Sequence, residues 1–212
     1  MTVAAALDRR AHWRARWEQV YREKEEADLS WHQDDPRVSF ALVSERCPPG
    51  GAVLDVGGGT SLLASRLAAA GREVTVLDIS SAALRRAQER AGPLAQRVRW
   101  AEADVLGPGC PPGPFDVWHD RAVFHFLVEP AERRRYAERA RASLRAGGHL
   151  VLATFAPDGP ERCSGLPVQR WSADELAAAL GPGFQLVESR RDVHVTPWGS
   201  EQAFLYAVLR RE

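Results

Sequence analysis

Three consecutive glycines near residue 57 limit the folds open to this chain more than any other feature. The segment before them, 52–56, combines Ala, Val and Leu around Asp55 and predicts a short buried strand. Gly57, Gly58 and Gly59 predict a turn that needs positive φ or lets a ligand approach the backbone. Residues 61–70 predict a helix whose first N–H groups are exposed. Such a strand–turn–helix unit is where α/β proteins bind nucleotide-like ligands.

The residues around the glycines favour one kind of nucleotide-like ligand. Leu62 stands where the dinucleotide fingerprint G-x-G-x-x-G has its third glycine, and no Gly-Lys-Ser/Thr of a P-loop follows. Asp55 lies just before the turn, and a carboxylate there repels phosphate but suits a cation. A nucleoside with a positive amine and no phosphate fits better, and S-adenosyl-L-methionine (SAM) is such a ligand.

The rest of the chain alternates between apolar β segments and helical segments. This alternation predicts an α/β fold with a mostly parallel sheet and helices on both faces. The predicted helices are 4–26, 36–46, 81–90, 130–144 and 172–180, and the further strands are 74–78, 98–100, 115–119 and 148–155. The last two strands, 184–193 and 203–210, have no helix between them and predict an antiparallel hairpin.

Polar residues follow the predicted strands, at the edge of a parallel sheet where ligands bind. Asp78 ends the second strand, nineteen positions after Gly59, a spacing typical of an acidic residue that accepts hydrogen bonds from ribose hydroxyls. Asp104 follows the third strand, where a carboxylate can accept from an adenine amino group. His119, Asp120 and Arg121 end the fourth strand.

These features together resemble the class I SAM-dependent methyltransferases. The resemblance is carried by 53–61, Asp78, Asp104 and 115–119, and it covers about residues 37–210. It implies a Rossmann-like seven-stranded sheet whose last strand is antiparallel. We therefore expect a methyltransferase domain over 37–212, preceded by an N-terminal helix and lid segment over 1–36.

The resemblance also implies which residues contact the cofactor. Gly57 and Gly59 would lie against the methionine part of SAM, and Asp78 would bind both ribose hydroxyls. Asp104 would bind the adenine amino group beside the Val105 backbone, with Ile79 on the adenine face. The full set of expected cofactor-binding residues is Trp17, Tyr21, Trp31, Asp55, Gly57, Gly58, Gly59, Asp78, Ile79, Asp104, Val105 and His119.

A second resemblance concerns the N-terminal segment. Residues 17–21 and 29–31 resemble a segment of small methyltransferases, among them eukaryotic protein-lysine methyltransferases, that closes over the cofactor. That group tends to have Asp-Lys-Gly after the fourth strand, whereas this chain has Asp120-Arg121-Ala122. Residues 118–126 resemble bacterial methyltransferases instead. We therefore expect a small-molecule acceptor (N, O, S or metalloid), with a protein lysine as the alternative.

The acceptor is expected beyond the fourth and fifth strands. Methyl transfer depends on alignment, and a protonated acceptor also needs a base. His119 and His125, with Asp120 beside them, are the candidate catalytic residues, because histidine titrates near neutrality. Each also fits a structural role. The expected substrate-binding residues are Arg121, Phe124 and Cys163. Cys163 also fits a small packed core residue, and the four-residue spacing of Trp13 and Trp17 also fits core packing of their helix.

Composition narrows the alternatives. The 212 residues have zero formal net charge, which favours neither nucleic acid nor an anionic membrane as partner. The three cysteines are widely spaced and predict neither a disulfide framework nor a metal site. The N-terminus lacks an apolar signal-peptide core, so we expect a cytoplasmic location. The rivals from other classes are an NAD-dependent oxidoreductase, disfavoured by Leu62, and a non-catalytic SAM-binding module.

Overall fold

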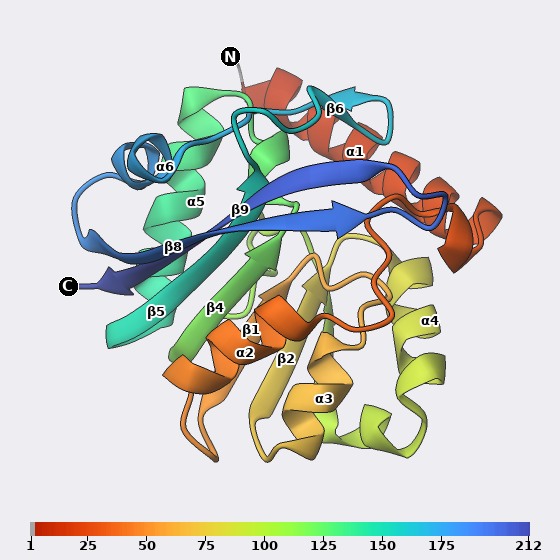
Figure 1. The fold of residues 1–212 in the computed structure, drawn as a ribbon, viewed down its shortest axis with the longest axis horizontal. Coiled ribbons are helices and arrows are strands. Elements are labelled where there is room, and N and C mark those ends of the chain that lie inside the picture. Colours follow the sequence, from red (N-terminus) through yellow and green to blue (C-terminus); the bar gives the residue numbers. More distant parts are fainter. Residues whose placement is uncertain (1–2) are drawn as a thin grey trace.

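The chain folds around one seven-stranded sheet flanked by helices (Figure 1). The computed structural model describes the backbone of residues 3–212 and the side chains of residues 11–212; residues 1 and 2 of the predicted lid segment lie outside the described residues. The helices are α1 (Val3–Glu23), α2 (Arg37–Arg46), α3 (Leu63–Ala69), α4 (Ser81–Ala91), α5 (Pro130–Ser143) and α6 (Ala173–Leu180), with 3-10 turns at Glu26–Asp28, Gly92–Arg97 and Phe124–Phe126.

The sheet has the order β3-β2-β1-β4-β5-β9-β8. Its strands are β1 (Ala52–Val56), β2 (Glu73–Asp78), β3 (Val98–Glu102), β4 (Phe115–Arg121), β5 (Leu144–Phe155), β8 (Phe184–Val195) and β9 (Glu201–Arg211). The pairs from β3 to β5 are parallel, and β9 is antiparallel to both β5 and β8. The predicted mostly parallel sheet with a closing antiparallel hairpin is confirmed.

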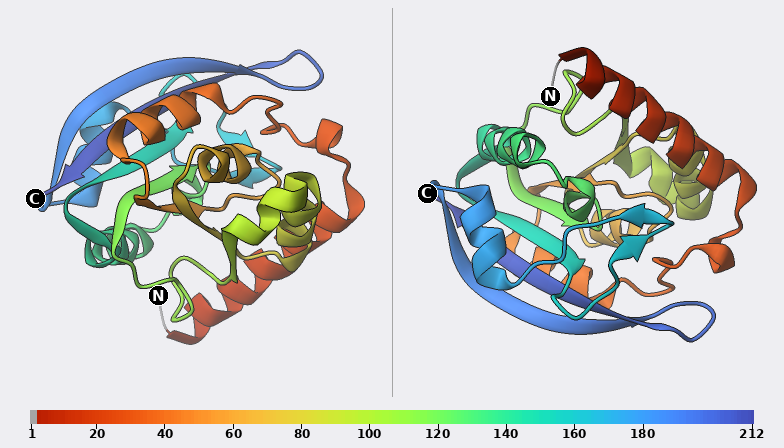
Figure 2. Two further views of the ribbon diagram at one scale, coloured as in Figure 1. Left: turned by 90° about the horizontal axis from the view of Figure 1, so that it is seen from below. Right: turned by 90° about the horizontal axis from the view of Figure 1, so that it is seen from above.

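The strands bury both faces because successive side chains point to opposite sides of the sheet. In β1, Val53 packs among residues of α2 and α3, whereas Leu54 and Val56 pack among residues of α5 and α6. Helices α2, α3 and α4 thus cover one face, and α5 and α6 cover the other (Figure 2). Helix α1 lies beside α4, at the end of the sheet where the parallel strands finish (Figure 2).

Serine side chains cap the start of two of the helices. The Oγ of Ser80 accepts a hydrogen bond from the amide of Ala83 at the start of α4. Ser172 and Glu175 form a reciprocal capping box at the start of α6. Ser80 lies two residues after Asp78, the last residue of β2, so α4 begins shortly after that strand ends.

Several boundaries differ from the predictions. Helix α1 ends at Glu23 rather than 26. Helix α3 begins at Leu63 rather than 61, because Ser61 still belongs to the turn and its Oγ accepts from the amide of Leu63. Strand β5 begins at Leu144, where the sequence predicts the end of the preceding helix. The segment after β5, where the sequence predicts no strand, contains a two-stranded hairpin, β6 (Arg162–Cys163) with β7 (Leu166–Pro167). Within the described residues, every helix is too short or too polar to span a bilayer.

Candidate functional site

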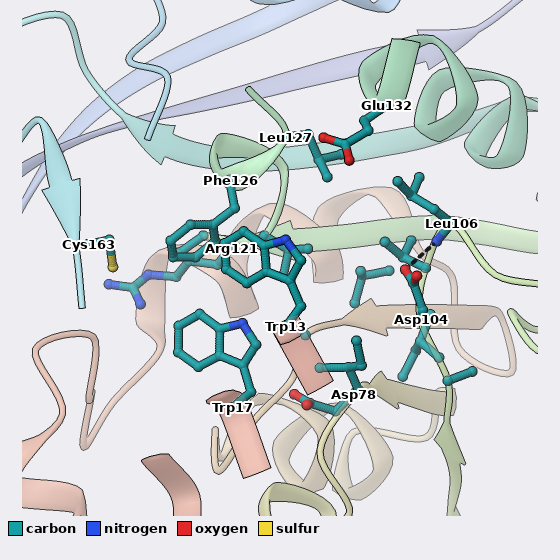
Figure 3. Close-up of a pocket in the computed structure, with 18 of the residues that line it drawn as sticks. Trp13, Trp17, Asp78, Asp104, Leu106, Arg121, Phe126, Leu127, Glu132 and Cys163 are labelled. Atoms are coloured by element: carbon teal, nitrogen blue, oxygen red, sulfur yellow. Dashed lines mark hydrogen bonds between the residues drawn. The ribbon is translucent and has the colours of Figure 1, made fainter. Parts of the chain in front are cut away.

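The carboxyl ends of β1, β2 and β4 meet where the strand order reverses around β1, and a cavity opens at that point. Figure 3 shows side chains from the strand ends and from α1 converging on it. Expected site residues make up much of its wall. The lining includes Trp13, Trp17, Tyr21, Trp31, Gly57, Asp78, Ile79, Asp104, Val105, Leu106, Arg121, Val123, Phe126, Leu127, Glu132 and Cys163.

The glycine turn has no room for side chains. Gly57 and Gly59 have φ of 63° and 53°, a conformation that favours glycine. A Cβ on Gly57 would lie 2.1 Å from the Cγ2 of Val123, and one on Gly59 would lie 2.5 Å from the Oη of Tyr21. The turn is therefore packed tightly between the segment after β4 and α1.

Two carboxylates line the cavity beside this turn. Asp78 accepts hydrogen bonds from the amides of Gly59 and Ser80, both at 2.9 Å. Burial raises the pKa of Asp78 to about 6, although these hydrogen bonds act to lower it. Asp104 accepts from the amide of Leu106 at 2.8 Å (Figure 3). Backbone hydrogen bonds thus hold both carboxylates at the cavity wall. The hydroxyl and amino groups of a nucleoside are donors of the kind that such carboxylates accept from.

A second recess lies on the other side of Gly57 and contains a buried polar array. The Nδ1 of His119 donates to the Oδ1 of Asp55 at 2.7 Å, and its Nε2 lies 2.9 Å from the Oγ of Ser39. The Oδ2 of Asp55 is buried and has no hydrogen-bond partner among the described residues. Tyr21 and Arg121 line both this recess and the cavity. An unsatisfied buried carboxylate oxygen favours a donor from a ligand.

Aromatic side chains form the outer wall. Trp13 and Trp17 stack with ring centroids 6.3 Å apart, and each meets Phe126 edge-on, at 5.3 and 5.4 Å. Trp31 lies edge-on to Trp17 at 5.6 Å. We call Trp13, Trp17, Trp31 and Phe126 the aromatic wall. The helical spacing of Trp13 and Trp17 thus places both side chains at the cavity (Figure 3).

Glu18 fastens α1 to the start of α4. Its carboxylate accepts from the Oγ of Ser80 at 2.8 Å, the amide of Ala82 at 3.0 Å and the Oγ of Ser81 at 3.1 Å. Burial acts to raise the pKa of Glu18, but these hydrogen bonds outweigh it and lower the pKa to about 2. The anion also lies at a helix N-terminus, which stabilises it further. The contact holds the aromatic wall over the strand ends.

Arg121 and Cys163 lie together at the end of the cavity away from Asp104 (Figure 3). Arg121 donates from Nη1 to the carbonyl oxygen of Trp31 at 3.0 Å, and its guanidinium stacks 4.4 Å from the ring centroid of Phe204. Burial raises the pKa of the Cys163 thiol to about 12, so the thiol is neutral. The β6–β7 hairpin places this cysteine against the cavity.

The structure does not bring every expected residue to the cavity. Asp120 is fully buried and accepts from the Oη of Tyr136 at 2.6 Å, and burial raises its pKa to about 6. Phe124 is also fully buried, in contact with the ring of Tyr136. His125 packs between Phe126 and Phe155, its ring nitrogens have no partner among the described side chains, and burial lowers its pKa to about 3. The Asp120 side chain points from β4 into the core, and the chain turns inward after Arg121, which buries Phe124 and His125 as well.

Sequence reasoning missed several residues of the site. Glu18 and Ser39 lie far from the glycine turn along the chain, and no local pattern separates them from ordinary helix residues. Only the packing of α1 and α2 brings Glu18 to Ser80 and Ser39 to His119. Leu106, Val123 and Glu132 likewise reach the wall through tertiary packing. The four-residue spacing of Trp13 and Trp17 was the one sequence feature that pointed to the aromatic wall.

Comparison with known sequences finds similarity to methyltransferases. A family model described as a methyltransferase domain matches residues 53–148. An uncharacterized methyltransferase of Mycobacterium tuberculosis strain H37Rv is 37% identical over 103 residues, which make up 49% of this chain and 50% of that relative. The chain spans about half the length of these curated relatives.

Two solved structures share the fold over nearly the whole chain. The 1,6-didemethyltoxoflavin-N1-methyltransferase of Burkholderia thailandensis, solved with 1,6-didemethyltoxoflavin and S-adenosylhomocysteine, has a TM-score of 0.71 at 21% identity, covering 100% of this chain and 92% of that one. The N-methyltransferase NodS of Bradyrhizobium japonicum, solved with S-adenosylhomocysteine, has a TM-score of 0.66 at 19% identity, covering 92% and 97%. Residues 53–148 therefore match a methyltransferase domain, and the chain has the Rossmann-like fold of SAM-dependent methyltransferases.

Proposed function

We propose that this protein transfers a methyl group from SAM to a small-molecule acceptor inside the cavity beneath α1. The observation that carries the proposal is the joint position of Gly57, Asp78 and Asp104 around one cavity, with Gly58 and Gly59 lining the adjoining recess. When bound, SAM supplies a methyl carbon made electrophilic by its sulfonium. The protein then has to bind, orient and exclude water, which is catalysis by positioning.

The cavity and the recess fit the two ends of this cofactor. Asp78 would accept from the ribose hydroxyls, and Asp104 would accept from the adenine amino group, with Ile79 and Val105 beside the ring. The orphaned Oδ2 of Asp55 would accept from the methionine ammonium. The expected adenine, ribose and methionine contacts thus follow one another along the ends of β3, β2 and β1.

We assign His119 a positioning role rather than that of a base. Both of its ring nitrogens are engaged, one by Asp55 and one by Ser39, and the ring is buried. A histidine held in this way orients the Asp55 carboxylate and leaves no nitrogen for an acceptor's proton. His119 acts on the cofactor through Asp55 in this proposal.

Cys163 and Tyr21, the titratable side chains that line the cavity beside Arg121, are not general bases at neutral pH. Cys163 has a raised pKa of about 12, and burial raises the pKa of the Tyr21 phenol still further above its ordinary value. His125 lies outside the cavity wall. An acceptor that arrives with an unprotonated nucleophilic atom needs no such base. This favours acceptors that are already nucleophilic at neutral pH.

The enclosure of the site favours a small acceptor over a protein side chain. Segment 1–36 supplies Trp13, Trp17, Tyr21 and Trp31 to the wall, and the Glu18 contact holds it in place. We propose that this segment acts as the lid and excludes water around the methyl group. The toxoflavin-type substrate of the Burkholderia enzyme, which has the same fold, is also a small molecule.

Two measurements test the proposed function. Thermal unfolding with SAM, S-adenosylhomocysteine and NAD should show stabilisation by both sulfur ligands and none by NAD, because a ligand stabilises the state that binds it. Incubation with methyl-labelled SAM and a cell extract should then place label in the small-molecule fraction. Stabilisation by NAD alone contradicts the cofactor, whereas label found only in protein contradicts the acceptor class.

A further inference from the structure

Two nitrogen atoms of the Arg121 guanidinium have no hydrogen-bond acceptor among the described residues. Its Nη1 donates to Trp31, but its Nε and Nη2 have no partner and are shielded from solvent. Buried guanidinium N–H groups are normally satisfied, because losing their water contacts without replacement is costly. Arg121 lines the cavity, so a ligand that binds there can bring the missing acceptor.

The charge of Arg121 is likewise uncompensated. No described carboxylate forms an ion pair with it, and the neighbouring Cys163 thiol is neutral because burial raises its pKa. His194 and His125 face the same guanidinium and have their pKa values lowered, by burial first and by Arg121 second. The surroundings of Arg121 thus contain neutral groups, and a sulfonium in the cavity adds a further positive charge. An anionic group on a ligand offsets the positive charges of the guanidinium and of the sulfonium.

The position of Arg121 indicates which ligand brings that anion. Its guanidinium stacks on Phe204 of β9 and points toward Cys163, away from Asp78 and Asp104 (Figure 3). The expected ribose and adenine contacts therefore lie at the opposite end of the cavity. Figure 3 also shows Trp17 and Phe126 beside the guanidinium. Arg121 also borders the recess of Asp55, so its two unpartnered N–H groups lie between the expected methionine end of SAM and the part of the cavity where an acceptor would approach the methyl group.

The aromatic wall indicates the shape of the acceptor. Trp17, Trp31 and Phe126 present ring faces and edges to this part of the cavity. Rings stack offset or edge-on with one another, and a planar ligand ring gains the same contacts. An aromatic cluster alone would equally suit a cationic ligand, but the adjacent guanidinium repels one.

We propose that the methyl acceptor is an aromatic molecule bearing a carboxylate, and that the Nε and Nη2 of Arg121 bind this carboxylate beside the aromatic wall. A guanidinium matches the two oxygens of a carboxylate with paired N–H donors. The inference rests on the proposed function, because it places the acceptor relative to bound SAM. It goes further in naming the class of acceptor and the residue that selects it.

Paired ligands test the proposal directly. The protein, saturated with S-adenosylhomocysteine, is titrated with benzoate, phenylacetate and indole-3-carboxylate, and separately with the three matching carboxamides. We expect at least one carboxylate to bind at least tenfold more tightly than its amide. Arg121→Gln should abolish this preference, whereas Arg121→Lys should retain part of it, because Lys keeps the charge without the paired donors. Arg134→Gln, which removes an exposed arginine of α5, is the matched control and should bind as the wild type does.

The outcomes separate three explanations. Equal binding of acids and amides, or no binding of any carboxylate, overturns the proposal while leaving SAM binding intact. If Arg121→Gln instead weakens the binding of S-adenosylhomocysteine tenfold but not that of 5′-methylthioadenosine, which lacks the amino-acid part, the guanidinium holds the cofactor's own carboxylate and the proposal is wrong. Failure of the wild type to bind S-adenosylhomocysteine at all contradicts the proposed function itself.

Discussion

At the scale of single residues, burial determines which charged groups can do chemistry. Asp78 keeps two backbone hydrogen bonds yet has a raised pKa of about 6, because burial outweighs them. His125 is neutral for the same reason, with a pKa lowered to about 3. Sequence spacing correctly brings Asp78 and Asp104 to the cavity wall. It cannot reveal that Asp120 points from β4 into the core, or that the chain turns inward after Arg121 and buries Phe124 and His125.

Asp78 should make cofactor affinity depend on pH. Ribose hydroxyls donate to the carboxylate form, and with a pKa of about 6 only about one tenth of Asp78 is ionised at pH 5. We expect the Kd for S-adenosylhomocysteine, measured by calorimetry, to rise about tenfold between pH 7.5 and pH 5. Asp78→Asn should bind more weakly and show little dependence on pH. A wild-type Kd that stays constant over this range contradicts the role given to Asp78.

His125 should make folding stability depend on pH in the same range. Burial lowers its pKa from 6.5 to about 3, so between these values the unfolded chain binds a proton that the folded chain does not. Stability is therefore lost as pH falls, by about 2 kcal/mol for this residue at pH 5. Urea unfolding of the wild type and His125→Leu at pH 7.5 and 5 measures the difference. If both proteins lose the same stability on acidification, His125 is not buried as described.

At the scale of elements, hydrophobic and turn patterns predicted most boundaries. Strand β1 begins and ends where its apolar residues do, and α4 begins after its Ser80 cap. The β6–β7 hairpin was missed because two-residue strands carry no periodic signal. The attachment of α1 was missed as well, since the partners of Glu18 lie more than sixty positions away along the chain. Long-range contacts of this kind determine how α1 packs against the start of α4.

Removing the carboxylate of Glu18 should loosen α1. Glu18→Gln loses charge-assisted hydrogen bonds to the start of α4, where caps contribute about 0.5–2 kcal/mol. We expect faster amide hydrogen exchange in α1 and a Kd for S-adenosylhomocysteine raised about three- to tenfold. Glu23→Gln on the same helix is the matched control, because Glu23 is exposed and contacts only Gln19. Equal exchange in the two variants would show that Glu18 does not hold the lid.

At the scale of the whole molecule, the strand order explains why one cavity unites distant residues. The reversal around β1 places the ends of β2 and β4 on either side of the glycine turn. The α/β alternation was enough to predict that edge, and the acidic residues at the strand ends were enough to predict the cofactor. The acceptor end was not predictable in the same way, since α1, β9 and the β6–β7 hairpin assemble it from separate parts of the chain.

The most direct test of the central claim is a calorimetric titration of the wild type and Gly59→Ala with S-adenosylhomocysteine. The cofactor lies against the glycine turn in this account, and a Cβ on Gly59 would collide with Tyr21 and strain a backbone at φ 53°. We expect one molecule bound per wild-type chain and at least tenfold weaker binding by a folded Gly59→Ala. Absence of binding by the wild type, or equal binding by both proteins, would contradict the assignment of this cavity to SAM.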